Sequence, residues 1–130
     1  MRTAKDLVAS ARSRIHELSP AELRAWDAHD FTLIDVREAE EYAAGYLPGA
    51  INLPRGVLEF RIETLPALVD AANPACADRA RPLVVYCLSG GRSALAADSL
   101  QQLGFGKVHS LAGGFEAWRA AGLPVAQPET

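Results

Sequence analysis

Two runs of the chain are almost wholly apolar over the length of a β-strand. They cover residues 31–36 and 82–86. A strand with one face toward water alternates apolar and polar residues, whereas a strand buried on both faces does not. Both runs therefore predict strands in the interior of a sheet. Shorter apolar steps predict three further strands, one near Ile15 and two over residues 50–53 and 107–111.

The segments between these strands carry apolar residues at helical spacing. An amphipathic helix is predicted over residues 1–14, and Ser19 and Glu22 form a capping box ahead of a second helix. Further helices are expected over residues 37–44, 57–65 and 94–103 and over the stretch that carries Phe115 and Trp118. Because strands alternate with helices, the sequence predicts a three-layer α/β fold, with a mostly parallel sheet of about five strands and helices on both faces.

Composition narrows the classes of protein to consider. With 130 residues, of which 49% are hydrophobic and 22% charged, the chain is expected to form one domain without disulfides or a structural metal. Its formal charge of −3 gives no excess of basic residues for binding phosphates, so no nucleic-acid partner is expected. No apolar run has the length of a signal-peptide core or a membrane span, and there are only two cysteines. A cytoplasmic protein without a membrane partner is therefore expected.

The segment with the most distinctive chemistry follows the strand predicted over residues 82–86. Cys87 stands at the C-terminal end of that strand, where an open parallel sheet binds its ligands. The glycines after it let backbone N–H groups turn inward, and the next helix directs the positive end of its dipole at the loop. These surroundings favour a nucleophilic thiolate over a thiol that only fills the core. The loop expected to bind an anion consists of Leu88, Ser89, Gly90, Gly91, Arg92 and Ser93.

The length of this loop separates two kinds of cysteine chemistry. Four residues lie between Cys87 and Arg92, one fewer than in the Cys-x5-Arg loop of cysteine-dependent phosphatases. The shorter loop should be too tight for a phosphate but suited to one extra sulfur atom on the cysteine. Cys76 has no strand before it and no glycines after it, so it is interpreted as an incidental loop cysteine rather than a resolving thiol.

A recognisable pattern is carried by four stretches, which are residues 33–37 with Glu41 and Tyr42, residues 45–54, residues 86–93, and residues 111–118. Through these stretches the sequence resembles the single-domain rhodanese family of sulfurtransferases over residues 15–125. One departure is Tyr46, where the family commonly has histidine before a Pro-Gly turn, and this change is expected to affect packing more than chemistry.

The resemblance implies a rhodanese-like fold and a two-step transfer of sulfur. Cys87 would take a sulfane sulfur from a donor such as thiosulfate and pass it from a persulfide to cyanide or a thiol. A protein acceptor is also compatible, and the chain is expected to be a monomer or weak dimer that needs no cofactor or metal. Residues 1–14 would be an added helix, residues 15–125 the domain and residues 126–130 a tail. The alternatives are a non-catalytic binding or redox-sensing module and, less favoured because of the short loop, a phosphatase or arsenate reductase.

Three more residues lie at strand ends on the side of Cys87, namely Asp35, Arg37 and Arg55. Arg37 is expected to pair with Glu41, four residues later on a helix, rather than to bind substrate. Arg55 is the better candidate for recruiting an anionic donor.

Arg92 and Ser93 complete the set of candidates. Arg92 suits either a cation that binds a sulfonate and favours the thiolate, or a clamp on the loop carbonyls. Ser93 is expected to act as an N-cap or first-turn hydroxyl rather than as a catalytic acid.

Overall fold

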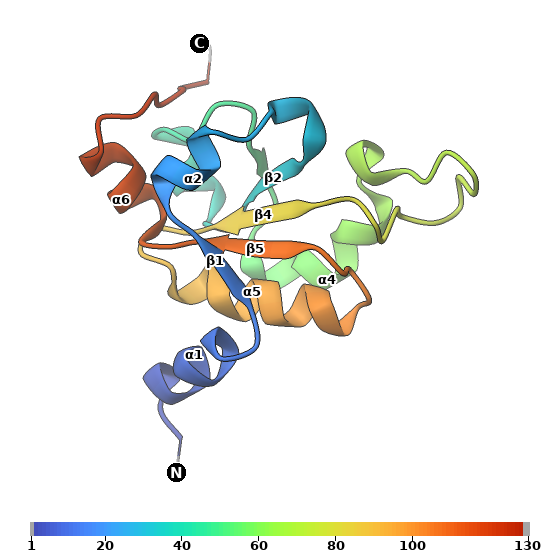
Figure 1. Ribbon diagram of the computed structural model, residues 1–130, viewed down its shortest axis with the longest axis horizontal. Coiled ribbons are helices and arrows are strands. Elements are labelled where there is room, and N and C mark those ends of the chain that lie inside the picture. Colours follow the sequence, from blue (N-terminus) through green and yellow to red (C-terminus); the bar gives the residue numbers. More distant parts are fainter. Residues whose placement is uncertain (1, 129–130) are drawn as a thin grey trace.

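Five parallel strands form the centre of the molecule. The computed structural model describes residues 2–128 and places the strands in the order β1-β5-β4-β2-β3 (Figure 1). Every neighbouring pair is parallel, as the alternation of strands and helices predicted. The strands are β1 His16–Leu18, β2 Thr32–Asp35, β3 Ile51–Asn52, β4 Leu83–Tyr86 and β5 Val108–Leu111.

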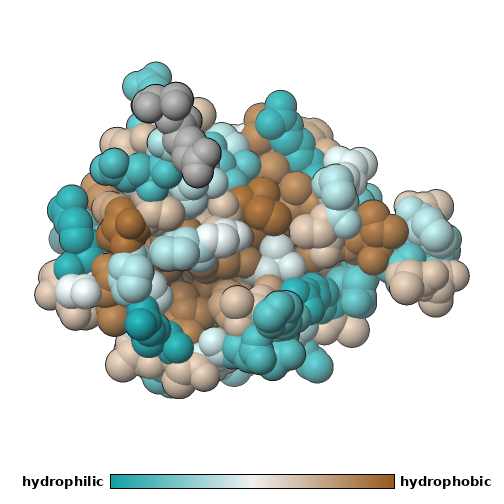
Figure 2. Space-filling view, turned by 90° about the horizontal axis from the view of Figure 1, so that it is seen from above, coloured by the Kyte–Doolittle hydropathy of each residue, from teal (hydrophilic) through white to brown (hydrophobic). Residues whose placement is uncertain are grey.

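Helices cover both faces of this sheet, so the predicted three-layer α/β fold is confirmed (Figure 1). In Figure 1, α1, α4 and α5 lie below the strands, whereas α2 and α6 lie above or beside their C-terminal ends. Seen from above, the molecule presents hydrophilic and apolar residues side by side, with apolar residues exposed near the centre of the view (Figure 2). The helices are α1 Ala4–Arg12, α2 Pro20–Arg24, α3 Ala39–Ala43, α4 Leu58–Arg61, α5 Gly91–Gln102 and α6 Gly114–Ala120.

The central strand β4 shows why its sequence does not alternate. Leu83 and Val85 belong to the core beneath the sheet, together with residues of α4 and α5. Val84 and Tyr86 belong to the second core, together with residues of α2 and α6. Because successive side chains of a strand point to opposite faces, a strand between two cores needs apolar residues at every position. Cys87, the next residue after the strand, belongs to the core beneath the sheet.

The N-terminal helix α1 packs on α5 of the same chain. Thr3 and Asp6 form a capping box at its start, and Ala11 is fully buried. Just after the helix, Arg14 donates hydrogen bonds of 2.9 and 2.8 Å to the carboxylate of Asp98 on α5. No helix among the described residues is long and apolar enough to cross a membrane.

The predicted boundaries differ most from the structure at two places. The helix expected over residues 57–65 is broken into α4 and two 3-10 turns, Arg55–Val57 and Ile62–Thr64. The last turn ends at Thr64, since Leu65 before Pro66 takes an extended conformation. The expected tail begins as an ordered segment, because Ala126 exchanges two backbone hydrogen bonds with Tyr46. Residues 129 and 130 of that tail lie outside the described residues. The division of the chain at residues 14 and 125 stays a prediction.

Candidate active site

Cys87 lies directly after β4, at the start of the loop that leads into α5. Its side chain is 1% exposed. The backbone N–H of Gly90 donates to the Cys87 sulfur at 3.1 Å. Gly90 reaches this position with a φ of +108°, in the left-handed region that glycine adopts without strain. The loop therefore closes back on the sulfur, as the two glycines predicted.

Ser93 stands in the first turn of α5 with its hydroxyl beside the sulfur. The Cys87 Sγ lies 3.6 Å from Ser93 Oγ, which donates to the carbonyl of Gly90 at 3.3 Å. Gly90 is the N-cap of the helix, so Ser93 lies in its first turn, and its expected role as a first-turn hydroxyl rather than a catalytic acid stays a prediction. Ser110 on β5 lies 2.8 Å from the same hydroxyl and is fully buried. Sequence reasoning missed Ser110, although a serine inside an apolar strand is a signal for a buried polar contact.

The start of α6 holds the loop through two of its backbone carbonyls. The N–H of Phe115 donates to the Cys87 carbonyl at 2.8 Å, and the N–H of Glu116 donates to the Leu88 carbonyl at 3.0 Å. Gly114 makes this approach possible, since a Cβ there would lie 2.7 Å from the Leu88 oxygen and would overlap the Cys87 oxygen. Because the C=O and N–H of a trans peptide point in opposite directions, the N–H groups of Leu88 and Ser89 point away from α6.

Arg92 does not act as a clamp on the loop carbonyls. Among residues 2–128, its hydrogen bonds go to Glu41 of α3, at 2.7 and 3.0 Å. The Arg92 guanidinium lowers the pKa of Glu41 to about 2, and the hydrogen bond to Glu41 raises the pKa of Arg92. The charge of Cys87 also interacts with Arg92 and raises the Arg92 pKa, although this effect is smaller. Arg92 thus ties the loop to α3 while it keeps a positive charge near the sulfur.

The predicted pair of Arg37 with Glu41 is wrong. Arg37 instead donates to both oxygens of Asp35 at 2.7 to 3.1 Å and to the carbonyl of Gly45 at 2.7 Å. Arg37 precedes the helix, which begins at Ala39, so the four-residue spacing does not bring its side chain to Glu41.

Asp35, Arg37 and Tyr86 form a buried network beneath the loop. The Asp35 and Arg37 side chains are 0% and 3% exposed. The Tyr86 hydroxyl donates to Asp35 at 2.7 Å and accepts the N–H of Leu47 at 3.1 Å. Burial, together with the negative charge of Asp35, raises the pKa of Tyr86. Since these groups satisfy one another, Asp35 and Arg37 support the ends of β2 and β4. A part of either residue in binding substrate stays a prediction.

Arg55 is held by Glu59, one helical turn further along the chain. Its Nη1 lies 3.0 and 2.8 Å from the two carboxylate oxygens of Glu59. Glu59 also accepts the hydroxyl of Ser99 on α5 at 2.5 Å. The role of Arg55 in recruiting an anionic donor stays a prediction.

Cys76 lies in the loop before β4, whereas Cys87 directly follows the C-terminal end of that strand. Cys76 is exposed, and its loop precedes the N-terminal end of β4, at the far right of Figure 1. A four-residue strand spans on the order of 13 Å, whereas a disulfide needs Cα atoms within about 7 Å. The two thiols are therefore both free and are not placed to bridge.

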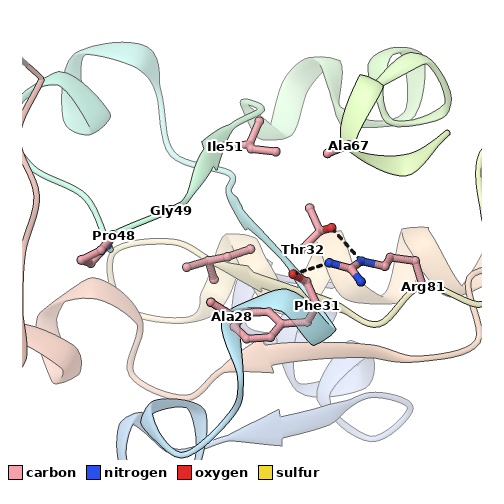
Figure 3. Close-up of a pocket in the computed structure, with 9 residues that line it drawn as sticks. Ala28, Phe31, Thr32, Pro48, Gly49, Ile51, Ala67 and Arg81 are labelled. Carbon is pink, nitrogen blue, oxygen red and sulfur yellow. Dashed lines mark hydrogen bonds between the residues drawn. The ribbon is translucent and has the colours of Figure 1, made fainter.

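Two of the cavities lie near opposite ends of β2. A groove of about 600 Å³ begins at Leu88 and is also lined by Glu41 and Phe115. A smaller pocket of about 250 Å³ lies at the other end of β2, where Arg81 donates to the Phe31 carbonyl and to Thr32 (Figure 3). Within residues 2–128, no group of His, Cys, Asp or Glu is arranged to hold a metal ion. The groove thus borders Leu88, the residue that directly follows the candidate nucleophile.

Comparisons with known proteins agree with this geometry. A "Sulfurtransferase" of Allochromatium vinosum is 37% identical over 82% of this chain and 88% of its own length. A thiosulfate sulfurtransferase GlpE of Coxiella burnetii is 33% identical over 75% of this chain and 83% of its own length. The solved structure of a Rhodopseudomonas palustris protein of unknown function, described as a possible tyrosine phosphatase, is 34% identical, covers 97% of this chain and 96% of its own, and has a TM-score of 0.78.

These relatives support a rhodanese-type sulfurtransferase. A family profile described as "Rhodanese-like domain" matches residues 19–121, which include all the candidate residues discussed above. The chain therefore belongs to the rhodanese-like domain family.

Proposed function

We propose that this protein transfers a sulfane sulfur from thiosulfate or a persulfide to a thiol or to cyanide, through a persulfide on Cys87. One observation carries the proposal. The Cys87 sulfur is enclosed by a loop with only four residues before Arg92, and the N–H of Gly90 already donates to it at 3.1 Å. The name of the Coxiella burnetii relative supports thiosulfate as a donor.

The first step loads the enzyme. The Cys87 thiolate attacks the outer sulfur of thiosulfate, a Cys87 S–S bond forms, and the S–S bond of thiosulfate breaks with its electron pair leaving on sulfite. The negative charge moves to the new outer sulfur. Backbone N–H groups and the nearby Arg92 cation stabilise that charge, because preorganised donors need no rearrangement during the reaction.

The second step transfers the outer sulfur from the Cys87 persulfide to the acceptor. A thiolate or cyanide attacks the outer sulfur, the Cys87 S–S bond breaks, and its electron pair returns to the Cys87 sulfur. Two half-reactions through one covalent intermediate give ping-pong kinetics. No cofactor, oxidant or reductant enters this scheme, since the sulfur transfer is balanced in atoms and charge at each step.

Two other functions can be separated from this one. A non-catalytic binding or redox-sensing module would need no covalent sulfur on Cys87. A phosphatase would need a loop that surrounds a tetrahedral phosphate, and the contact between Gly90 N–H and the sulfur at 3.1 Å leaves the loop closed around the cysteine itself.

Intact-mass measurement after exposure to thiosulfate tests the proposal. The expected result is a mass gain of one sulfur atom that is lost on addition of cyanide, with release of thiocyanate. Cys76→Ser should behave as the wild type and Cys87→Ser should gain nothing. An unmodified wild-type protein would support the non-catalytic module, and hydrolysis of an aryl phosphate that depends on Cys87 would support the phosphatase.

A further inference from the structure

The groove beside the loop has an outer wall that lies beyond the family match. It begins at Leu88, the residue after Cys87, and runs past Phe115 and Arg119 of α6. Val125 and Gln127 close its far side. Both follow residue 121, where the match to the rhodanese-like domain ends. The outer wall of this groove is therefore formed by residues that lie outside the family match.

Several contacts fix that outer wall. The indole N–H of Trp118 donates to the Pro124 carbonyl at 2.7 Å. Tyr46 and Ala126 exchange backbone hydrogen bonds of 2.9 and 2.7 Å. Val125 lies so close to Gly45 that a Cβ on the glycine would be 3.2 Å from it. A wall held in this way gives a groove that exists before a ligand binds, which lowers the cost of binding.

The charges that line the groove leave one cation without a partner. Arg37 is neutralised by Asp35, and Glu41 is neutralised by Arg92. Arg119 is exposed and makes no salt bridge within residues 2–128, and its guanidinium lies 5.5 Å from the Phe115 ring centroid. The groove therefore combines apolar walls with one available positive charge, a pattern that suits a small organic anion.

The volume of the groove indicates which substrate it takes. At about 600 Å³ it lies within the range of sites for organic ligands, and thiosulfate or cyanide would fill only a small part of it. A thiol acceptor, in contrast, has a carbon skeleton that needs a surface. Its sulfur must reach the Cys87 persulfide, so its other end must extend past Leu88.

We propose that this groove binds an acceptor thiol that carries a carboxylate, and that Arg119 selects it. The carbon chain lies along Leu88, Phe115 and Val125, and the carboxylate pairs with Arg119. The thiolate then attacks the outer sulfur of the persulfide, a new S–S bond forms on the acceptor, and the electron pair of the broken bond returns to Cys87. This inference rests on the proposed function, because it assigns the second substrate of that reaction.

Acceptors of similar size and different charge test the selection. The enzyme is first loaded with thiosulfate, and the rate of sulfur loss from Cys87 is then followed by intact mass with 3-mercaptopropionate, 2-mercaptoethanol or cysteamine. For each thiol the wild type is compared with Arg119→Gln, so that the intrinsic reactivity of the thiol cancels. For each thiol, the rate of sulfur loss in the wild type is divided by the rate in Arg119→Gln. This rate ratio should be about three- to fivefold larger for 3-mercaptopropionate than for 2-mercaptoethanol, as expected for a partly exposed ion pair. It should be smallest for cysteamine, because its ammonium group is repelled by Arg119.

A matched variant controls for overall charge. Arg61→Gln removes an exposed arginine of α4, outside the groove, and should give the same ratio for all three thiols. Equal ratios in Arg119→Gln, with normal loading, would overturn the role of Arg119 and leave the proposed function standing. If thiosulfate does not load Cys87, inorganic polysulfide is used to form the persulfide, and failure of both donors would overturn the proposed function and this inference together.

Discussion

Arg92 and Glu41 are 51 positions apart in the chain and are joined by two hydrogen bonds of 2.7 and 3.0 Å. The pair connects the start of α5 to α3, which follow the neighbouring strands β4 and β2. Because the C-terminal ends of parallel strands meet at one edge of the sheet, residues after the two strands come together there. The loop around Cys87 is thus held both by its own backbone and by Glu41 of α3, which follows a different strand.

The Glu41 carboxylate should make stability depend on pH. Its pKa falls from 4.5 to about 2 in the folded chain, chiefly because Arg92 donates to it. A lowered pKa contributes stability above the unfolded value, and this contribution is lost as the pH falls through the folded value. At pH 7 we expect the wild type to exceed Glu41→Gln by about 0.5 to 1 kcal/mol in the free energy of unfolding, allowing for solvent screening.

Urea denaturation over a series of pH values checks this dependence. The difference between the wild type and Glu41→Gln should shrink below pH 4.5 and vanish near pH 2. Glu40→Gln removes an exposed acid from the same helix and should show little of this effect. A difference that stays constant from pH 7 to pH 2 would show that the ion pair is not its source.

The buried network of Asp35 and Arg37 should be critical for folding rather than for substrate binding. Asp35→Asn would leave the Arg37 guanidinium buried without its counter-charge, and loss of one partner of such a pair costs about 3 to 5 kcal/mol. Tyr86→Phe removes one neutral donor to the same carboxylate and should cost only about 1 to 2 kcal/mol. Equilibrium unfolding in urea measures the loss of stability in both variants. If Asp35→Asn lost less stability than Tyr86→Phe, the Asp35–Arg37 pair would not be critical for folding.

Gly114 should be needed for the close contact between α6 and the loop. Gly114 and Gly122 both have positive φ, at +58° and +75°, but only at Gly114 would a Cβ overlap backbone atoms. Gly122→Ala should therefore cost about 1 kcal/mol from backbone strain alone. Gly114→Ala should cost about 1 to 3 kcal/mol more, because the loop must move away.

The same pair of variants can be compared by the rate of sulfur loading from thiosulfate. Loading should slow in Gly114→Ala, which displaces the Cys87 and Leu88 carbonyls, and should stay near the wild-type rate in Gly122→Ala. Equal rates in the two variants would mean that the α6 contact does not shape the loop.

Arg55 and Arg92 should differ in their effect on the first half-reaction. Glu59 already binds the Arg55 guanidinium, so Arg55→Gln should change the KM for thiosulfate by less than about twofold. Arg92→Gln removes one side of the ion pair that ties the Cys87 loop to α3, so the loop loses its position and loading should slow by about tenfold. Steady-state kinetics with thiosulfate and cyanide distinguish the two, and a large rise in KM for Arg55→Gln would restore Arg55 as a donor-binding residue.

Local patterns were sufficient to predict most of the elements and the identity of the loop. The uniformly apolar run that became β4 could be recognised because each of its side chains enters one of two cores. Ser19 and Glu22 form the predicted capping box, since a cap involves residues only three apart. Cys87 and its glycines could be singled out because strand, turn and helix follow one another within a few residues.

The partners of the charged residues could not be predicted in the same way. Arg37 was expected to bind Glu41, yet it binds Asp35, and Glu41 binds Arg92 from the other side of the site. Ser110 and the N–H groups at the start of α6 reach the loop from segments that follow it in the chain. An ion can form several local pairs of similar energy, and burial between segments decides which one forms.

The sequence by itself determined the order of strands and helices, the parallel sheet and Cys87 as the candidate nucleophile. These features depend on periodicity, caps and glycines, which act over a few neighbouring residues. Only the tertiary structure decided that Arg92 pairs with Glu41, that α6 holds the Cys87 carbonyl, and that Arg119 lines the groove beside Leu88. Those contacts join residues far apart in the chain, and they form because packing the helices on one sheet brings the residues to the same edge.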